Sequence, residues 1–496
     1  MRFSRTHIDG REMVAPSRGF GLHLANQLGV ADATSTASTS EDAARDDERR
    51  TGIYNFLQVP WNLEPLLVLG YITCLDSFLQ LITFMPIRVL VALVSLARGR
   101  TLTHAQRCGL LRAVLVVSVS LLLLNVDMSQ TYHMVRNQAM LKLYVIFNLL
   151  EVFDKLCSSF GQDILDSLDS SARRRRQWRG GLALDFVIAL VYTLLHTMVL
   201  FYHSVALNIA LNSHSNLIIT LLVSNNFVEL KSNVFKKCER ENLFQVACAD
   251  VVERFQMSVY LSLVALQFIF VQKVEATAAE WAELGASFLM ILASEITVDW
   301  IKHAFVIKFN RIEPTVYSSF IRLICEDASR AVRPARQSTS GATGAKSRSR
   351  SFGGSAAAVR AEGTSGAADP GNPSLTPHPG APTRSRVVAR HVGTAEAGEF
   401  SAPAAARMGF VPVPLLCLVI RVVGHDLAPR LYFGHPSGAL LCLLLWLVLC
   451  GVKMLTSITL LGVACMRADA SAAEEGSAAD FLYGIERFTL HGKGVM

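Results

Sequence analysis

Four ionisable side chains lie close together in the apolar segment SEITVDWIKHAF, residues 294–305. On a helix, Glu295, Asp299 and Lys302 stand at positions i, i+4 and i+7 and share one face. His303 follows Asp299 by four residues and falls beside that face. Ionisable groups at the depth of a bilayer are costly, so they pair with one another or face the protein interior. The four residues therefore form a candidate intramembrane polar cluster that could relay protons or ions.

A structural alternative gives the same four residues no chemistry. Lys302 begins a stretch of basic residues, 302–350, that the topology below assigns to the cytosol. An ion-paired helix end at the cytosolic interface, with the Lys302 ammonium group extended into water, fits this position, and we favour it. Asp76, Arg88 and Asp127 also lie in or beside apolar runs, and each could be a buried pair partner that holds helices together.

The other residues with possible chemistry form no recognisable catalytic pattern. His196, His203 and His214 lie in or beside apolar segments, but their spacing does not match the histidine motifs that gather iron in membrane hydroxylases. Each is expected to be a hydrogen-bonded structural residue. The stretch GATGAKS, residues 341–347, lacks the spacing of a phosphate-binding loop. We therefore expect no catalytic residue, no metal and no cofactor, and we expect that the protein is not an enzyme.

Two segments outside the strongest apolar runs mix aromatic and charged side chains. Residues 150–169 place apolar side chains near helical spacing, which is typical of a helix at a membrane interface or against a partner. Residues 224–255 have a similar mixture and are expected to be a structured cytosolic segment. Packing inside the protein is the alternative for their apolar members. The candidate partner-binding surface comprises Phe160, Asp163, Asn225, Asn226, Phe227, Lys231 and Phe235.

These residues must be positioned by apolar helices, because 51% of the chain is hydrophobic and only 18% is charged. Soluble domains carry about 25% charged residues. About 20 apolar residues cross a bilayer, so the chain is expected to be an all-α, polytopic helical membrane protein with six to ten membrane segments. The expected segments are 66–96, 110–126, 140–153, 182–201, 205–223, 257–272, 284–301, 411–423 and 439–465.

The first of these runs, residues 66–96, is too long for one simple span and contains Pro86. A proline inside a helix removes a hydrogen bond and clashes with the preceding turn. A kinked helix or a tight helical hairpin is therefore expected over this run, rather than one straight helix.

Basic clusters separate the apolar runs and predict the topology. They fall at residues 49–50, 98–112, 173–179, 231–240 and 302–350, with two segments expected between each consecutive pair. Basic loops stay on the cytosolic side of a membrane. The segments are therefore expected to be arranged as hairpins, with both termini in the cytosol.

Composition divides the chain into five regions. Residues 1–52 are polar and expected to be a disordered tail, and 53–327 form the main multi-pass membrane region. Residues 328–406 are rich in Ser, Gly, Ala and Pro and are expected to be a disordered cytosolic loop. Residues 407–466 form a C-terminal membrane hairpin, and 467–496 a short tail. The net charge of +7 fits loops facing an anionic leaflet better than a nucleic-acid-binding surface.

Several blocks of the sequence are long and rich in uncommon residues. They include YNFLQVPWNLEPLLVLGYITCLDSFLQLITFMPIRV, LKLYVIFNLLEVFDKLCSSFGQDILDSL, LNIALNSHSN, SNNFVELKSNVFKK, ASEITVDWIKHAF, RMGFVPVP and KMLTSITLLG. Over residues 54–324 and 407–465, in this order, they resemble the transmembrane anterior posterior transformation protein family. The long 328–406 insertion and the short C-terminal tail depart from the family pattern.

The resemblance implies a multi-pass protein of the endoplasmic reticulum, with the ciliary basal body as the alternative location. In the endoplasmic reticulum, the fungal relative works with a SUN-domain-like glycoprotein to protect newly made proteins from degradation. The resemblance carries over no catalytic residue.

Two functional hypotheses follow from the residues and the resemblance together. The first is a non-enzymatic integral membrane scaffold or adaptor that supports the folding, stability or trafficking of other proteins. Its expected partners are the lipid bilayer and other membrane or luminal proteins, including by resemblance a SUN-domain-like protein, but not nucleic acid. The alternative is an ion- or proton-coupled transporter or channel that uses Glu295, Asp299 and His303 as a polar path.

Overall fold

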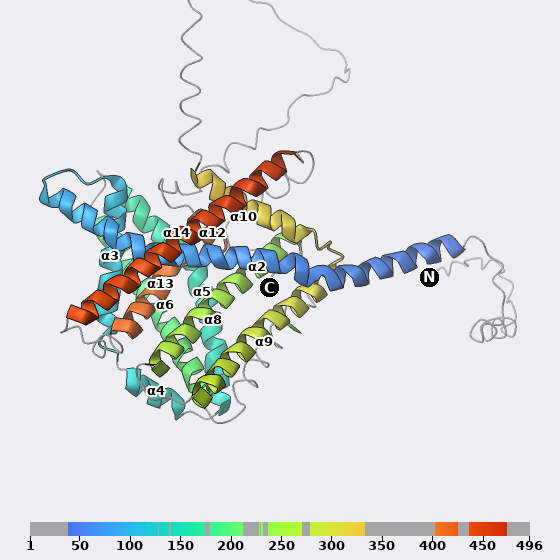
Figure 1. Ribbon diagram of the computed structural model, residues 1–496, viewed down its shortest axis with the longest axis horizontal. Coiled ribbons are helices and arrows are strands. Elements are labelled where there is room, and N and C mark those ends of the chain that lie inside the picture. The colour runs from blue at the N-terminus through green and yellow to red at the C-terminus, as the bar shows by residue number, and fades with distance from the viewer. Residues whose placement is uncertain are drawn as a thin grey trace, which may run out of the picture.

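The computed structural model describes residues 38–126, 128–137, 140–173, 179–211, 228, 230–231, 237–269, 278–332, 402–424 and 436–473. In these residues the regular secondary structure is helical throughout (Figure 1). The helices are α2 (Ser38–Ala97), α3 (His104–Leu123), α4 (Met128–Arg136), α5 (Met140–Arg173), α6 (Arg179–Leu211), α8 (Arg240–Gln267), α9 (Ala278–Asn310), α10 (Val316–Val332), α12 (Ala402–Arg407), α13 (Pro412–Val422) and α14 (Pro436–Ala473).

Among the described residues, five helical stretches are long and apolar enough to cross a membrane, and this confirms the polytopic helical class. They are Ala44–Ala97, His104–Leu123, Gly181–Ile209, Trp281–Asn310 and Gly438–Arg467, and the shorter apolar helix Pro412–Val422 accompanies them. Side chains on the outside of these stretches are apolar, as Leu444 and Val448 of α14 show by being exposed. A surface of this kind suits lipid tails. The total of six to ten segments stays a prediction, because much of residues 205–223 lies outside the described residues.

Helix α2 is a single helix of 60 residues that contains Pro60, Pro65 and Pro86. The hairpin alternative for residues 66–96 is therefore wrong. Pro86 has no N–H to donate to the carbonyl of Ile82, four residues earlier. That carbonyl instead accepts a hydrogen bond from the indole Nε1 of Trp446 on α14, at 3.3 Å. A neighbouring helix thus supplies the missing donor, which is how proline is tolerated inside membrane helices.

The first pairing of segments also changes, because a single α2 passes through a bilayer once between basic clusters 49–50 and 98–112. The hairpin arrangement then depends on the remaining pairs. The helix begins at Ser38, so residues 38–52 of the expected disordered tail are helical. Their sequence STSEDAARDDERRTG contains strong helix formers, and Arg49 pairs with Asp46 one turn away at 3.3 Å.

The expected loop 328–406 is helical at both of its ends. Helix α10 continues to Val332, and α12 begins at Ala402, while the residues between them lie outside the described part of the chain. Arg407 of α12 forms an ion pair with Asp327 of α10. This pair joins the two ends of the insertion.

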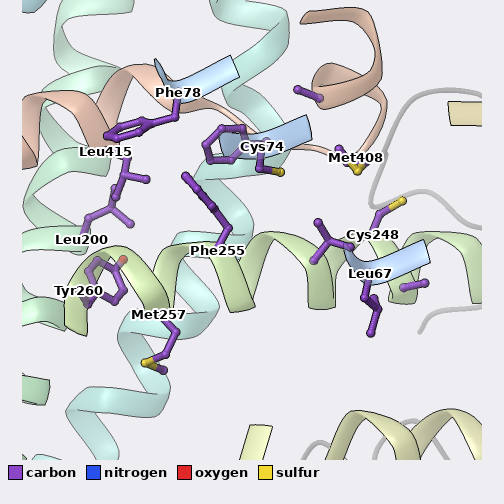
Figure 2. Close-up of a cluster of buried hydrophobic side chains, with 14 of the residues drawn as sticks. Leu67, Cys74, Phe78, Leu200, Cys248, Phe255, Met257, Tyr260, Met408 and Leu415 are labelled. Atoms are coloured by element: carbon purple, nitrogen blue, oxygen red, sulfur yellow. The ribbon is translucent and has the colours of Figure 1, made fainter. Parts of the chain in front are cut away.

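Helix α2 lies at the centre of the bundle and packs against α3, α8, α9, α10, α13 and α14 (Figure 1). The ring of Phe255 on α8 meets three other rings edge-on: Tyr71 and Phe78 of α2, and Phe410 before α13, at centroid distances of 5.2–5.8 Å. Figure 2 shows Phe255 of α8 below Phe78 and Cys74 of α2, with Leu67 of α2 farther to the right near Cys248. The core therefore joins segments from both sides of the 328–406 insertion.

Helices α5 and α6 form the most extensively packed pair in the bundle. They approach closely at Gly161, where a Cβ atom would lie 1.9 Å from the Tyr192 hydroxyl oxygen. Only glycine therefore leaves room for Tyr192 in this position.

Candidate functional site

The row of ionisable residues on α9 is buried, as the sequence analysis expected for groups at bilayer depth. Glu295 and Asp299 are 7% and 5% exposed, and Lys302 and His303 are fully covered. The expectation that Lys302 extends into water is therefore wrong. Its aliphatic stem is too deep in the bundle to reach the surface, and its ammonium group finds carboxylates instead.

Asp250 of α8 is the carboxylate that Lys302 and His303 of α9 contact. Lys302 donates from Nζ to Asp250 Oδ1 at 2.6 Å and to Asp299 Oδ1 at 3.1 Å. His303 lies with Nε2 at 2.8 Å from Asp250 Oδ2 and Nδ1 at 2.8 Å from the hydroxyl of Tyr317 on α10. Burial alone raises the pKa of the Asp250 carboxyl, but Lys302 and His303 together bring this pKa well below its usual range. Asp250 is therefore a carboxylate with both oxygens engaged.

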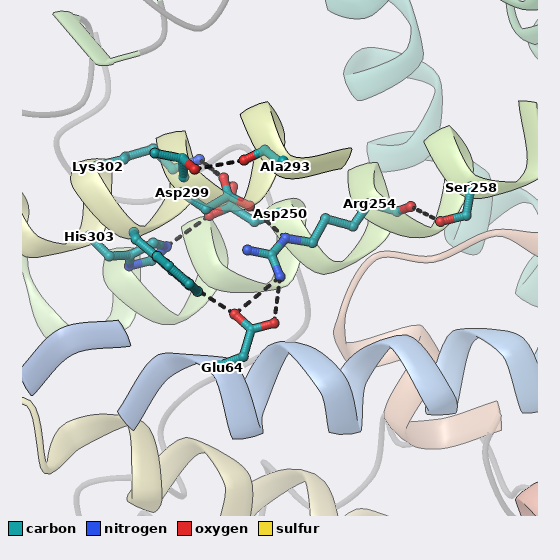
Figure 3. Close-up of polar contacts among 10 residues, drawn as sticks. Glu64, Asp250, Arg254, Ser258, Ala293, Asp299, Lys302 and His303 are labelled. Carbon is teal, nitrogen blue, oxygen red and sulfur yellow. Dashed lines mark hydrogen bonds and ion pairs between the residues drawn. The ribbon is translucent and has the colours of Figure 1, made fainter. Parts of the chain in front are cut away.

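Arg254, one turn after Asp250, extends the contacts to α2. Its Nε donates to Asp299 Oδ2 at 2.8 Å, and its Nη1 donates to Glu64 Oε1 at 3.1 Å. The indole of Trp300 donates to the other Glu64 oxygen at 2.9 Å. Figure 3 shows Glu64 below the Arg254 guanidinium group. To the left of this group lie Asp250, Asp299, Lys302 and His303. We call this set the Asp250 network: Glu64, Asp250, Arg254, Asp299, Lys302, His303 and Tyr317.

The Asp250 network brings together three of the four predicted cluster residues and joins four helices, α2, α8, α9 and α10. Three carboxylates face two permanent cations and one histidine, so the charges nearly balance. Sequence reasoning missed Glu64, Asp250, Arg254 and Tyr317. The i, i+4 spacing of Asp250 and Arg254 within segment 224–255 was the available signal.

Glu295, the fourth predicted residue, faces a different part of the bundle. It lines a pocket of about 60 Å³ between α5, α6, α8 and α9, which we call the interhelix pocket. Asp154 of α5 also lines it, and its Oδ1 lies 2.7 Å from His196 Nε2. His196 Nδ1 in turn lies 2.9 Å from the Tyr192 hydroxyl. His196 is thus a hydrogen-bonded structural residue, as expected, whereas His203 lines the pocket.

A second buried ion pair joins α2 to α14 and confirms the expectation that Asp76 is a buried pair partner. Lys453 Nζ lies 2.7 Å from each carboxylate oxygen of Asp76. Thr456 and Ser457 donate their hydroxyls to Asp76 Oδ1 at 2.9 and 2.8 Å. Three side chains of α14 thus donate to the Asp76 carboxylate, which lies between two apolar helices.

Arg421 of α13 is fully buried and serves the end of another helix. Its Nε donates to the carbonyl of Leu123 at 2.8 Å, and its Nη2 donates to the carbonyl of Val126. These carbonyls lie at the C-terminal end of α3, where the last backbone acceptors have no partner within the helix. A cation is favourable there because the helix dipole is negative at that end. Arg421 therefore attaches α13 to α3.

The candidate partner-binding surface is described in part. Phe160 is 60% exposed, and Asp163 and Lys231 are exposed as well. Asn225, Asn226, Phe227 and Phe235 lie outside the described residues. The structure adds four exposed apolar side chains that precede Phe160 on the same face of α5. We call the row the α5 stripe: Val145, Leu149, Val152, Leu156 and Phe160.

Among the described residues, no group of three or more His, Cys, Asp and Glu side chains has the geometry to hold a metal ion. The carboxylates instead contact Lys, Arg and His. In the Asp250 network this arrangement ties helices together.

Comparison with known proteins gives the chain a clear set of relatives. The model of a eukaryotic membrane protein family matches residues 102–469. A Danio rerio protein, Transmembrane anterior posterior transformation protein 1 homolog, is 34% identical over 87% of this chain and 66% of its own length. A Caenorhabditis elegans Protein TAPT1 homolog is 32% identical over 86% of this chain and 52% of its own length.

A third relative is Endoplasmic reticulum membrane protein 65 of Schizosaccharomyces pombe. It is 38% identical over 55% of this chain and 47% of its own length. The chain thus spans about half to two thirds of the length of these three relatives. No solved structure matches the chain.

Proposed function

The chain belongs to the eukaryotic membrane protein family, and from this premise we propose that it is a non-enzymatic integral membrane scaffold or adaptor. The resemblance to the transmembrane anterior posterior transformation proteins is confirmed by the curated relatives. The proposal places the protein in the endoplasmic reticulum, because the S. pombe relative is named for that membrane. The ciliary basal body, implied by the resemblance, is the alternative location, and cytosolic termini are part of the proposal.

The observation that supports the proposal is that the buried charged side chains pair with one another across helices. Lys302 and Arg254 contact carboxylates from three helices, and Lys453 is fully engaged by Asp76. Catalytic sites leave a nucleophile or a base open toward a substrate. Here the charged groups are paired across helices, which supports a role in assembly of a rigid bundle.

The α5 stripe is the surface proposed to bind partners. Helix α5 is not among the five candidate spans, yet the five apolar side chains of the α5 stripe are exposed. The partners would be other membrane or luminal proteins, with a SUN-domain-like protein as the partner implied by the resemblance. Nucleic acid is not a proposed partner.

The scaffold proposal is tested by Phe160→Glu in the full-length protein, tagged and purified from cells in a mild detergent. A buried aromatic anchor contributes about 2 kcal/mol or more at an interface, so recovery of co-purifying membrane and luminal proteins should fall at least about tenfold. Tyr54→Glu is the matched control, because Tyr54 is also an exposed aromatic residue, at 64%, but lies on α2. Equal partner recovery from Phe160→Glu and Tyr54→Glu would remove the α5 stripe from the proposal.

A second candidate function is transport of protons or ions. It is favoured by one observation: Glu295 lines the interhelix pocket, and Asp299 and His303 follow it on α9 toward Asp250. In proteoliposomes, Asp299→Asn should then reduce a pH- or ion-dependent flux. The absence of any such flux in the unmodified protein would eliminate this candidate.

A further inference from the structure

The interhelix pocket is lined by acidic side chains. Four carboxylates line it: Glu151 and Asp154 of α5, Glu253 of α8 and Glu295 of α9. One lysine, Lys155, also lines it, and its Nζ lies 2.6 Å from Glu151 and 4.0 Å from Glu253. Carboxylate oxygens accept hydrogen bonds and attract positive charge, so a lining of this kind favours a cationic ligand.

Asp154 is ionised in this setting. Burial alone raises the pKa of its carboxyl, but the hydrogen bond and the charge of His196 more than reverse this effect and lower the pKa below its usual value. Asp154 therefore lines the pocket as a carboxylate at neutral pH, with one oxygen bonded to His196.

Two buried polar side chains in the pocket lack hydrogen-bond partners among the described residues. Neither ring nitrogen of His203 is bonded, although the residue is 92% buried, and the Tyr260 hydroxyl is unbonded in a residue that is 98% buried. The two rings stack with centroids 5.3 Å apart, and the Phe147 ring meets His203 edge-on at 4.4 Å. Buried polar groups are normally hydrogen-bonded, so these atoms point to a ligand that bonds with them.

The size and chemistry of the pocket restrict the class of ligand that it can bind. A buried water needs roughly 10–15 Å³ of such volume, so about 60 Å³ holds about four water-sized groups. An apolar ligand would leave His203 and Tyr260 unbonded, and an anion would meet four carboxylates. A primary ammonium group has three donors and no acceptor, which suits carboxylate oxygens, an imidazole nitrogen and a phenol oxygen.

We infer that the interhelix pocket binds the primary ammonium group of an aminoethyl compound. The class includes free ethanolamine and the ethanolamine headgroup of a membrane lipid, which share this chemistry. The carboxylates supply the charge, and His203 and Tyr260 supply the remaining acceptors. The site is independent of the proposed scaffold function, since none of the five residues of the α5 stripe lines the pocket.

Binding is tested with purified full-length protein. One arm titrates ethanolamine into the protein in dodecyl maltoside and follows the signal by ligand-observed NMR. The other places the protein in phosphatidylcholine nanodiscs with and without phosphatidylethanolamine and detects retained lipid by native mass spectrometry. Binding in the first arm alone identifies a free amine as the ligand source, and retention in the second identifies the lipid. Choline, which has no N–H donor, should compete at least tenfold less well than ethanolamine.

Two conservative variants connect binding to the pocket. Glu253→Gln removes one charge and should weaken ethanolamine binding at least tenfold, and Tyr260→Phe removes one acceptor and should weaken it several-fold. Glu241→Gln is the matched control, because Glu241 is an exposed acid on the same helix, α8. Thermal midpoints of all variants check that each protein is folded. The inference is overturned if neither probe binds, if choline binds as well as ethanolamine, or if folded Glu253→Gln and Tyr260→Phe bind like Glu241→Gln.

Discussion

Lys302 holds two carboxylates at once, and it does so in the most deeply covered part of α9. Its Nζ contacts Asp250 on α8 and Asp299 on its own helix. A buried pair of this kind adds little net stability over an apolar core, but removing one partner leaves a charge without compensation. The contribution of Lys302 to stability is therefore best measured by removing it, which leaves Asp250 and Asp299 without their shared cation.

Lys302→Met should lower stability by about 3–5 kcal/mol, because Asp250 and Asp299 would lose their shared cation. The measurement is the thermal unfolding midpoint of the purified protein in detergent. Lys308→Met is the control, since Lys308 is an exposed lysine near the end of the same helix.

The double variant Lys302→Met with Asp250→Asn removes one charge of each sign. It should unfold at a higher temperature than Lys302→Met alone, because one of the two carboxylates left without the lysine has been neutralised. A Lys302→Met midpoint equal to that of Lys308→Met would show that the pairing does not hold the helices together.

At this scale the sequence predicts which residues share a helix face but not what they contact. The i, i+4 and i+7 spacing placed Glu295, Asp299 and Lys302 on one face without any knowledge of the bundle. The partners of Lys302 and Asp299 could not be assigned, because Asp250 and Arg254 lie 52 and 45 positions away from them and meet them only after tertiary packing. The error at Lys302 arose because a lysine that begins a basic stretch resembles one that reaches water.

Helices α5 and α6 show how one residue sets the approach of two elements. Gly161 on α5 makes room for the Tyr192 hydroxyl on α6, and Tyr192 in turn contacts His196. The Tyr192–His196–Asp154 chain then closes back onto α5 at 2.7 Å. The pair of helices is thus held by sterics at one point and by hydrogen bonds at the other.

Gly161→Ala should displace Tyr192 and break its contact with His196, because the added Cβ would lie 1.9 Å from the hydroxyl oxygen. The loss of one hydrogen bond and the strain of repacking should cost roughly 1–3 kcal/mol. Gly181→Ala on α6 is the control, since a Cβ there meets nothing within 4 Å.

A shorter side chain at residue 192 should relieve this clash. Gly161→Ala combined with Tyr192→Leu is expected to be less destabilised than the sum of the two single changes, as measured by thermal midpoints. Strict additivity would mean that Gly161 does not act through Tyr192.

Helix α2 shows which part of an element the sequence predicts and which part depends on another element. The length of the apolar run and Pro86 correctly indicated that residues 66–96 were not an ordinary span. The hairpin alternative failed because the carbonyl of Ile82 finds its donor on Trp446 rather than by ending the helix. A donor 364 residues away in the chain leaves no local signal.

The whole molecule is one bundle made from two stretches of chain. Helices α13 and α14 follow the 328–406 insertion, yet α13 packs against α3 and α6, and α14 against α2 and α10. Arg421, Lys453 and Trp446 each make a polar contact with an earlier helix. The C-terminal hairpin is therefore an integral part of the same fold.

Cleavage at a protease site inserted at residue 370 of the full-length protein should leave the two fragments associated in mild detergent. The contacts across the cut include the buried Asp76–Lys453 pair and the packing of α13, which do not depend on the connecting chain. Co-purification of the C-terminal fragment with a tag on the N-terminal fragment measures the association.

Lys453→Met should release a substantial part of the C-terminal fragment after cleavage, because the buried Asp76 would lose the cation that compensates its charge. Lys308→Met serves again as the control. Complete separation of the unmodified fragments would show that the insertion itself holds the bundle together.

The helical class, the membrane setting and several spans were predictable, because apolar run length follows directly from bilayer thickness. The order in which helices pack was not, since α2 gathers partners from both halves of the chain. Composition predicted that the disordered N-terminal tail extends to residue 52, but helix α2 already begins at Ser38. The Ala, Glu and Arg residues of segment 38–52 are good helix formers, although they are also common in disordered tails.

The Asp76–Lys453 pair also has a consequence for the synthesis of the chain, because its two residues are made at different times. The two residues are 377 positions apart, which corresponds to roughly 20–75 s of synthesis at about 5–20 residues per second. During that interval α2 has left the ribosome with an acidic group in its apolar stretch, and the lysine that neutralises it has not yet been made. Until α14 arrives, this carboxyl group must take up a proton or keep contact with water or with another protein, so α2 depends on its surroundings while the rest of the chain is made.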